Sequence, residues 1–411
     1  MKTPRFLELE GRSIGFYFVL FVLAGFIAAG LGAFIYMEHE GHWVTHMNNQ
    51  IVWGTPHVFA VFLIVAASGA LNVASISSVF GKKLYKPLAP FSAVLAIALL
   101  IGGLMVLVLD LGRPERLIIA MTYYNFKSIF AWNIILYNGF IAIVLVYLWM
   151  MMERRFNKYS KFAGLFAFLW RLTLTTGTGS IFGFLVARVA YNEAIMAPMF
   201  IVMSFAYGLA IFILIIVATY SWSGREVGEV LLYRLRRLLG VFVAGALYFV
   251  VVYHLTNLYI TERHGIEAFI LSGESVFSKV FWYGQILAGA VLPLALIYFP
   301  GLKCRTSLLL ASLLIVVGGI CQMYVTIVGG QAYPLEIFPD KEVISSFSDG
   351  VINAYSPSLP EVLLGLGGVG MALFLVVFAA KVLRLLPESL ADRDIDPHYS
   401  TENASKQAPA A

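Results

Sequence analysis

Long apolar segments alternate with short polar ones along the whole chain. A membrane-spanning helix needs about 20 mostly apolar residues. On this criterion the sequence predicts ten spans, at residues 14–36, 54–80, 88–109, 128–152, 163–187, 198–223, 238–259, 279–299, 305–329 and 361–386. The apolar runs are continuous, whereas a transmembrane β-barrel has short segments of alternating polarity. The pattern therefore predicts an all-α integral membrane protein with ten transmembrane helices.

Composition and charge agree with this class. Of the 411 residues, 60% are hydrophobic and 12% are charged, which is about half the charged fraction of a soluble domain. Most of the 28 Lys and Arg residues fall in loops on the side of the N-terminus, and such loops stay in the cytoplasm. We therefore predict a multi-pass protein of the bacterial inner membrane, surrounded by the lipid bilayer, with both termini cytoplasmic and no nucleic-acid partner.

A slight internal repetition divides the predicted spans into two halves. Pro56 at the start of the second span has a counterpart in Pro198 at the start of the sixth, and Asp110 at the end of the third has one in His254 at the end of the seventh. Four spans separate the members of each pair, so the two halves would have the same orientation. We predict a transmembrane domain over residues 1–386, with two four-helix bundles (54–187 and 198–329) flanked by the first and last spans, and a disordered cytoplasmic tail at 387–411.

Ionisable groups gather at the outer ends of the predicted spans. Such groups are costly in hydrocarbon and are therefore functional candidates. Gly112 and Pro114 end the third span, which would hold Asp110 on a rigid turn beside three supporting charged residues: Arg113, Glu115 and Arg116. The alternative is a capped helix end with a local Asp110–Arg113 ion pair.

The segment DLGRPER at residues 110–116 resembles the membrane-subunit family of NrfD and polysulfide reductase. The small-residue segment 68–75 and the turn 80–88 fit the same family, and the resemblance covers residues 10–386. Within the family, the chain is most similar to DsrP of the sulfite-reductase-linked Dsr membrane complex. Some relatives carry a quinone-contacting histidine in the middle of the small-residue span, where this chain has Ser-Gly-Ala. A histidine role would therefore pass to another position, such as His57.

The resemblance also implies a function. Members of the family carry no redox cofactor of their own, and they exchange electrons between a quinone near the outer face and an iron–sulfur subunit docked there. This implies a quinone-interacting subunit of a respiratory complex in sulfur metabolism, with menaquinone or ubiquinone as substrate and no tightly bound redox cofactor. The implied partners are a periplasmic ferredoxin-like iron–sulfur subunit, a multihaem cytochrome and other membrane subunits. The chain would be non-catalytic alone, or the quinone oxidoreductase subunit of the complex.

Quinone chemistry needs hydrogen-bond partners at two carbonyl oxygens and a group that exchanges protons with water. Histidine and a partly buried aspartate suit this role, and His57 and Asp110 fall at the outer ends of adjacent predicted spans. They are the main predicted residues for quinone binding and proton exchange, with Tyr123, Tyr124 and Asn133 as secondary candidates. The alternative for His57 is a histidine bonded to a backbone carbonyl at a helix start.

Three further polar groups are candidates. A cluster in the second half would be a vestigial site or a second proton-handling site: Tyr253, His254 and Asn257. A stripe in the fifth span would be a proton path, although hydroxyls commonly bond back to their own helix: Arg171, Thr175 and Thr178. The histidines within 39–46 have the spacing of metal ligands on a helix, but an exposed amphipathic segment at a partner interface is the favoured interpretation. No metal site is predicted.

Two other functions compete with quinone chemistry. A haem b subunit would use His57 and His254 as axial ligands that face each other at equal depth. A secondary transporter of ten helices in two repeats would place its binding residues on discontinuous helices near the membrane midplane. The strongly polar residues of this chain crowd one interface instead, which disfavours the transporter.

Overall fold

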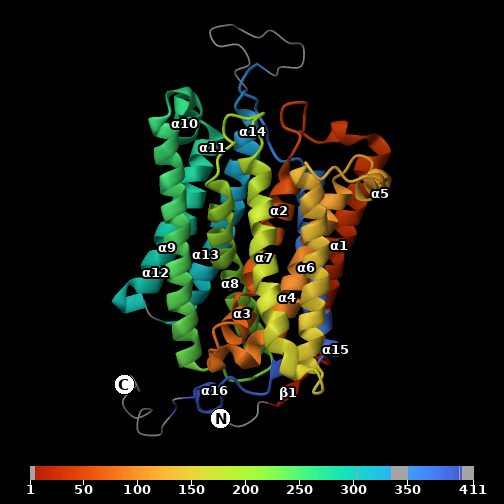
Figure 1. Cartoon of the computed structure of the whole chain (residues 1–411), viewed down its shortest axis with the longest axis vertical. Helices are drawn as coiled ribbons and strands as arrows, with labels where there is room; N and C mark the ends of the chain where they lie inside the picture. The colour runs from red at the N-terminus through yellow and green to blue at the C-terminus, as the bar shows by residue number, and fades with distance from the viewer. Residues whose placement is uncertain (1–4, 303, 335–349, 398, 400–411) are drawn as a thin grey trace.

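The structure is a computed structural model that describes residues 5–302, 304–334, 350–397 and 399. Long helices run side by side along the long axis of the molecule (Figure 1). Among the described residues, nine helices are long and apolar enough to cross a membrane. They are α1 (Ile14–Glu40), α2 with α3 (Thr55–Ala70, Asn72–Ser78), η2 with α4 (Lys83–Leu88, Ala89–Leu109), α6 (Ile129–Met152), α8 (Met196–Trp222), α9 (Glu229–Tyr259), α11 with η6 and α12 (Val276–Lys279, Val280–Val291, Leu292–Tyr298), α13 with η8 and α14 (Arg305–Tyr324, Val325–Gly329, Gly330–Ala332), and α15 (Leu359–Val382).

One further long helix, α7 (Ser160–Gly183), explains why nine helices meet this criterion where the sequence predicted ten spans. It has 24 residues, which is a spanning length, and it lies beside α6 and α8. Its apolar character is weaker because it carries Arg171 and several threonines. The predicted fold is therefore confirmed as an all-α membrane protein, with α7 as a polar helix among the apolar ones.

Helix α2 lies at the centre of this arrangement and is buried along almost its whole length. It packs against α4, α8 and α15, and α1 packs along the outside of α15. A Cβ atom on Gly69 of α2 would overlap the backbone oxygen of Ser204 in α8, and one on Gly208 would overlap the backbone nitrogen of Ala70. Small residues at such contacts are typical of membrane helices. The small-residue segment therefore joins α2 tightly to α8.

The two ends of the helix stack carry different residues. At one end, the lower one in Figure 1, β1 (Phe6–Leu7) pairs antiparallel with β2 (Leu386–Pro387), and α16 (Asp392–Ile395) lies close by. We call it the basic end, after Lys82, Arg154, Arg225 and Arg237. The opposite end holds α5 (Leu117–Thr122) and α10 (His264–Leu271). We call it the histidine end, after His42, His57, His254 and His264.

Part of the segment predicted to be a disordered tail contacts the basic end. Leu390 forms a β-bridge with Val227, and the carboxylate of Asp392 accepts a hydrogen bond from the backbone N–H of Val230 at 3.2 Å. These contacts place residues 388–397 against the start of α9. Residue 398 and residues 400–411 lie outside the described residues.

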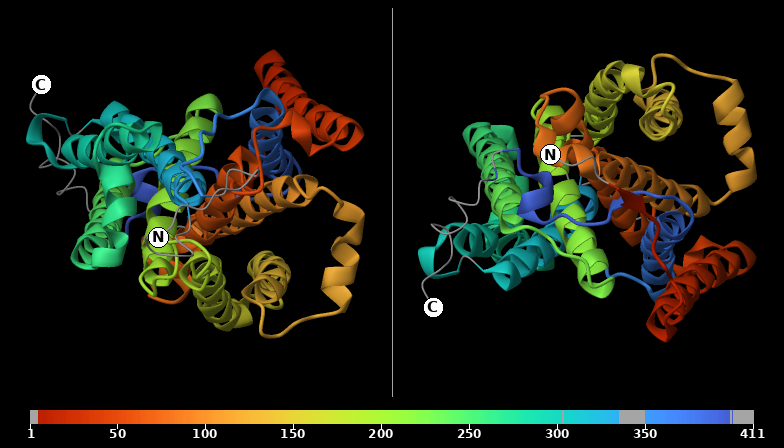
Figure 2. Two further views of the ribbon diagram at one scale, coloured as in Figure 1. Left: turned by 90° about the horizontal axis from the view of Figure 1, so that it is seen from above. Right: turned by 90° about the horizontal axis from the view of Figure 1, so that it is seen from below.

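The segment that follows the DLGRPER turn stands away from the other helices. Figure 2 shows α5 at the edge of the molecule, with connecting segments leading out from α4 and back to α6. It follows a short 3₁₀ turn, η3 (Pro114–Arg116), and its side chains Ile118 and Ile119 are 61% and 54% exposed. An exposed apolar face on a short helix near the end of the helix stack suits a helix that lies in the membrane interface.

Candidate functional site

The structure brings His57 and Asp110 together at the histidine end. Thr55 starts α2 and Pro56 follows it, where the fixed φ of proline suits the first turn of a helix, so His57 also falls in this turn. Asp110 caps the C-terminus of α4. The His57 Nδ1 atom lies 2.7 Å from Asp110 Oδ2, and the two side chains are 15% and 1% exposed. The two helices are packed against each other, so the pair is held from both sides.

The Asp110 carboxylate has fewer partners than its burial requires. Its Oδ1 atom is buried and has no hydrogen-bond partner among the described residues, and the contact between Oδ2 and His57 is close without being aligned as a hydrogen bond. The alternative Asp110–Arg113 pair is not formed, since Arg113 is exposed and makes no ion pair in the described part of the chain. A buried carboxylate without donors is costly. This one is therefore suited to accept a hydrogen bond from a ligand hydroxyl.

Trp53 forms an aromatic wall beside this pair. Its ring stacks on the His57 ring with centroids 5.9 Å apart and planes 23° apart. Phe130 of α6 and Phe182 at the end of α7 contact the same indole at 6.1 and 6.0 Å. Aromatic rings at these distances pack favourably with other flat rings. The site therefore combines a His–Asp pair with a surface against which a planar ligand can stack.

Two buried glutamines hold the loop that carries Trp53. The Gln331 side chain accepts hydrogen bonds from the backbone N–H groups of Val52 and Trp53 at 3.0 and 3.1 Å, and its amide donates to the Trp53 carbonyl at 3.0 Å. The Gln50 amide donates to the carbonyls of Gln331 and Ala332 at 3.1 and 3.0 Å. Because buried backbone groups need such partners, these side chains fix the loop before α2.

A buried carboxylate, Glu361, anchors the start of α2 from α15. It is 0% exposed and completes a capping box with Ser358 at the start of α15. The Tyr355 hydroxyl donates to Glu361 and accepts a hydrogen bond from the backbone N–H of Thr55 at 2.7 Å. At Gly54, an added Cβ atom would overlap Glu361 Oε1, so only glycine fits there. Burial raises the pKa of Tyr355, which keeps its hydroxyl protonated as a donor.

The secondary candidates of the first half have other surroundings. Tyr123 is 81% exposed, and Tyr124 stacks on Phe126 with centroids 5.9 Å apart. The amide of Asn133 donates to the carbonyls of Ile129 and Gly177 at 2.9 and 3.0 Å, so it joins α6 to α7. The three supporting charges of the DLGRPER turn lie at the surface: Arg113, Glu115 and Arg116. Among the described residues, none of these side chains forms a hydrogen bond or an ion pair with His57 or Asp110.

The predicted polar stripe on α7 is buried and divides into two parts. Arg171 donates from Nη1 to the carbonyl of Ser68 at 3.1 Å, and Thr175 donates to the Ser68 hydroxyl at 2.6 Å. Thr178 lies further along and contacts Tyr137 at 3.4 Å. Thr175 and Thr178 also bond back to carbonyls of their own helix, as the alternative interpretation expects. The Nε atom of Arg171 is buried without a partner in the described part of the chain.

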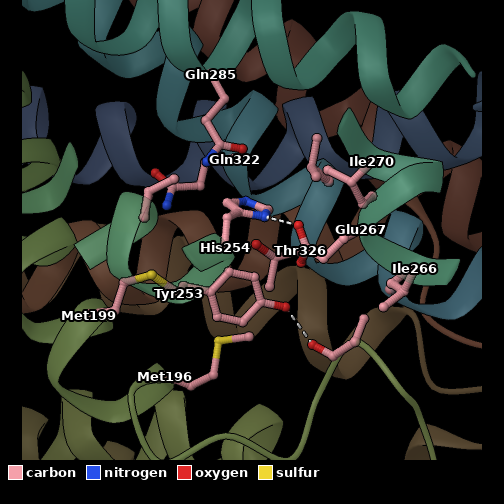
Figure 3. Close-up of a pocket in the computed structure, with 14 residues that line it drawn as sticks. Met196, Met199, Tyr253, His254, Ile266, Glu267, Ile270, Gln285, Gln322 and Thr326 are labelled. Atoms are coloured by element: carbon pink, nitrogen blue, oxygen red, sulfur yellow. Dashed lines mark hydrogen bonds and ion pairs between the residues drawn. The ribbon is translucent and has the colours of Figure 1, made fainter. Parts of the chain in front are cut away.

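A second His–carboxylate pair lies in the second half. His254 Nδ1 is 2.7 Å from Glu267 Oε2 of α10, and the amide of Asn257 donates to Glu267 Oε1 at 2.9 Å. Figure 3 shows Glu267 facing His254, while the hydroxyl of Tyr253 donates to the Ala190 carbonyl at 2.8 Å. Neighbouring positions on a helix point about 100° apart, so Tyr253 and His254 contact different partners. Glu267 contacts both His254 and Asn257.

The same cluster borders a small cavity of about 40 Å³, which is enough for a few water molecules. Gln285 lines this cavity from the π-helical segment η6, is 7% exposed, and has an Oε1 atom without a partner among the described residues. A second cavity of about 20 Å³ continues past Gln285 and Gln322 to Tyr207. Segments of π-helix often occur at functional sites. The cavities are lined mainly by apolar side chains, and they bring the polar groups of His254, Gln285 and Gln322 next to spaces that can hold water.

Arg263 and Glu193 form a third ion pair, next to the second cluster. Glu193 should make the stability of the folded protein depend on pH. Arg263 donates to Glu193 and, at 2.8 Å, to Asn257. Burial raises the pKa of Glu193 from its ordinary 4.5 to about 7; Arg263 opposes this shift, and the nearby Glu267 charge adds to it. A raised pKa means that the folded chain binds this proton more tightly than the unfolded chain does.

We therefore expect the melting temperature of the protein to fall as pH rises from about 4.5 to 7, where Glu193 loses its proton, and to level off above. Glu193→Gln should flatten this slope, because glutamine does not titrate. Thermal unfolding of the full chain in detergent at a series of pH values measures both. Glu262→Gln is the matched control, since Glu262 is exposed on the neighbouring turn. An unchanged slope in Glu193→Gln would contradict this assignment.

Several residues of these sites are not apparent from the sequence: Trp53, Gln331, Glu361 and Glu267. Gln331 lies in α14 and Glu361 in the first turn of α15, far along the chain from the helix they hold. The capping box of Ser358 and Glu361 is the available signal for Glu361, because Ser-x-x-Glu before an apolar run marks a helix start. The metal-ligand spacing within 39–46 does not produce a cluster: no group of three metal-ligating side chains is found among the described residues.

The fold and site define a multi-pass membrane protein with two His–carboxylate pairs at its histidine end, one between α2 and α4 and one between α9 and α10. Residues 43–334 match the family described as Polysulphide reductase, NrfD, and the chain belongs to this family. It is 28% identical over 400 residues to the Hdr-like menaquinol oxidoreductase integral membrane subunit of Archaeoglobus fulgidus, an alignment that covers 95% of this chain and 99% of that protein. It is 24% identical over 408 residues to a selenate reductase subunit of Mesobacillus selenatarsenatis, with 88% and 93% covered.

Proposed function

We propose that this chain is the quinol-oxidising membrane subunit of a respiratory redox complex. The observation that carries the proposal is the pair of His57 and Asp110, 2.7 Å apart and beside the ring of Trp53, with a carboxylate oxygen left without a partner among the described residues. The relatives support the same role, since one is named a menaquinol oxidoreductase subunit and another a reductase subunit. Menaquinol is therefore the preferred substrate in this proposal, with ubiquinol as the alternative.

In this proposal the quinol ring stacks on the indole of Trp53, and one quinol hydroxyl donates a hydrogen bond to Asp110 Oδ1. When the quinol gives up two electrons, its two hydroxyl protons must go to nearby bases. Asp110 accepts one of them and passes it to the adjacent His57 imidazole, which releases it to water at the histidine end. The second proton leaves the other quinol hydroxyl directly to water. The electrons leave to an iron–sulfur partner subunit docked at the histidine end.

The topology fits this arrangement. We propose that α7 is a tenth span, that two groups of four helices form the halves, and that the basic end with both termini faces the cytoplasm. The bias of Lys and Arg toward that end supports the orientation. The histidine end would then face the periplasm, where a ferredoxin-like subunit and a multihaem cytochrome can dock. The exposed α5 and the loops around it offer a surface at that end.

The purified chain alone should bind a quinone analogue but reduce no soluble electron acceptor, because this proposal gives it no redox cofactor. Adding the iron–sulfur partner should start the transfer of electrons from menaquinol. Quinol absorbance with and without the partner measures this, and analogue binding is measured separately by fluorescence quenching of the tryptophans. Quinol turnover by the chain alone, free of metal and flavin, would contradict the proposal.

We further propose sulfur metabolism as the setting, on the resemblance of the chain to DsrP. The support is the sequence pattern of residues 10–386, since the relatives named above act in menaquinol and selenate chemistry by their names. Neighbouring genes for a sulfite reductase, a multihaem cytochrome and a ferredoxin-like protein would support this setting. Neighbouring genes for a different terminal reductase would contradict it.

For the second cluster we propose a role in proton exchange. His254 and Glu267 border cavities that can hold water and that extend toward Gln322, and their volume is too small for a quinone ring. The α7 stripe of Arg171, Thr175 and Thr178 is proposed as a second polar route toward Trp53. A haem b held by His57 and His254 does not fit, because α8 packs between α2 and α9, which carry these histidines.

A further inference from the structure

A cavity of about 620 Å³ opens at the basic end, between the start of α1, the end of α8 and the last turns of α15. It is far from the proposed quinone site, which lies at the histidine end. Its wall toward the middle of the helices is apolar and consists of Val19, Leu23, Leu214, Ile215, Leu373 and Val377. These residues lie within membrane-spanning helices, so the apolar part of the cavity is at the depth of the lipid chains.

The rim of this cavity is cationic. Arg225 donates from Nη2 to the carbonyl of Glu8 at 3.0 Å, while its Nη1 is buried without a hydrogen-bond partner among the described residues. Arg12 lines the same rim, is exposed, and forms no ion pair in the described part of the chain. The carboxylate of Glu10 on the rim is exposed, and that of Glu8 is taken by Arg384 at 3.1 Å. Two arginines are therefore left to bind an anion.

The surroundings of the rim add to its preference for an anion. Helix α1 begins at Ile14, directly after Arg12 and Ser13, and the N-terminus of a 27-residue helix carries partial positive charge. Trp222 stands on the rim and is 59% exposed, and tryptophan is enriched at the level of lipid headgroups. Lys381 of α15 donates to the Glu10 carbonyl and keeps a further positive charge close by. Cationic and aromatic groups thus lie beside an apolar wall.

We propose that this cavity binds an anionic phospholipid. Its phosphate would be held by Arg225 and Arg12, because guanidinium groups bind phosphate through paired hydrogen bonds. One acyl chain would lie against the apolar wall of α1, α8 and α15, and the rest of the lipid would remain in the bilayer. Basic pockets between helices on the cytoplasmic side of membrane proteins bind such headgroups. The bound lipid would contact α1, α8 and α15 at once and so stabilise their packing from the membrane side.

Native mass spectrometry of the full chain, with phosphatidylglycerol or phosphatidylcholine of identical acyl chains, tests this proposal. The wild type should prefer phosphatidylglycerol, and Arg225→Gln and Arg12→Gln should each lower the affinity for it by about fivefold, the usual effect of one surface arginine on anionic lipid. Arg237→Gln is the matched control: it removes the same charge at the same end, but Arg237 lies on α9 and does not line the cavity. It should leave the lipid preference unchanged.

A second variant tests the apolar part of the site. Val19→Trp would fill the cavity beside the acyl chain and should lower the binding of both lipids without changing their ratio. If Val19→Trp or Arg225→Gln fails to fold, Arg12→Gln still tests the proposal, because Arg12 is exposed. Equal binding of the two lipids by the wild type would overturn the proposal. So would an equal loss in Arg237→Gln, or a quinone found in the cavity in place of lipid.

Discussion

Asp110→Asn should lower the rate of quinol oxidation by about 10²–10⁴-fold, the usual loss when a general acid or base is removed. Asparagine keeps the size of the side chain and can still accept a hydrogen bond, but it does not take up the proton of a quinol hydroxyl. Asp110 is buried, and the charged residues of its own turn lie at the surface, so none of them replaces it at the ring. The measurement is menaquinol oxidation per assembled complex.

His57→Gln should lower turnover in the same way and should also weaken the binding of a quinone-site inhibitor, because His57 stacks on Trp53. Substitution of His254 should have a smaller effect, since the proposed quinone site is in the first half. Arg113→Gln is the matched control: the charge lies on the same turn as Asp110 but is exposed, so turnover should be nearly unchanged.

Two outcomes would distinguish a structural role of Asp110 from a role in proton exchange. If Asp110 has only a structural role, Asp110→Asn should reduce the yield of folded complex and leave turnover per folded molecule nearly intact. If it exchanges protons, the complex should assemble and turnover should fall. Normal turnover in well-folded Asp110→Asn and His57→Gln would remove this pair from the mechanism without affecting membership of the family.

The helices could be predicted from the sequence because a membrane-spanning helix has a length that the bilayer sets. The predicted spans 128–152 and 198–223 correspond to Ile129–Met152 and Met196–Trp222. The prediction differs most at α9, which starts at Glu229 rather than near residue 238. Its first turns carry Arg234, Arg236 and Arg237 and are amphipathic rather than apolar, so they continue the helix beyond the apolar run.

The pairing of His57 with Asp110 could be anticipated because adjacent antiparallel spans bring their outer ends together. The aromatic wall and its supports could not, because they depend on contacts between distant parts of the chain. Gln331 reaches the Trp53 backbone from 278 positions away, and Tyr355 reaches Thr55 from 300 positions away. Neither hydrophobic periodicity nor local motifs carry information on such contacts.

In the cluster of Tyr253, His254 and Asn257, too, the sequence pattern did not predict the residue that holds the cluster together. Tyr253, His254 and Asn257 were predicted as a cluster because they are neighbours on one helix. The structure places Glu267 of α10 against His254 and Asn257, so the group that organises the cluster lies on the next short helix. Its position follows from the turn Thr261–Arg263 that precedes α10, and the pattern of helix faces alone does not predict it.

Tyr355→Phe should lower the free energy of unfolding by about 1–3 kcal/mol, the cost of leaving buried hydrogen-bonding groups without partners. The substitution keeps the ring but removes the hydroxyl that accepts from the Thr55 N–H and donates to Glu361. Because Thr55 starts the helix that carries His57, we also expect weaker binding of a quinone-site inhibitor, which a change in stability alone would not produce.

The matched control is Tyr324→Phe. Tyr324 lies beside Tyr355, with ring centroids 6.3 Å apart, and its hydroxyl forms no hydrogen bond within the described ranges. We therefore expect the free energy of unfolding of this variant, measured by thermal and denaturant unfolding in detergent, to be close to that of the wild type. Equal losses of stability in the two variants would show that the Tyr355 hydroxyl does not anchor α2. A stability loss in Tyr355→Phe with full inhibitor affinity would show that the anchor supports the fold but does not position His57.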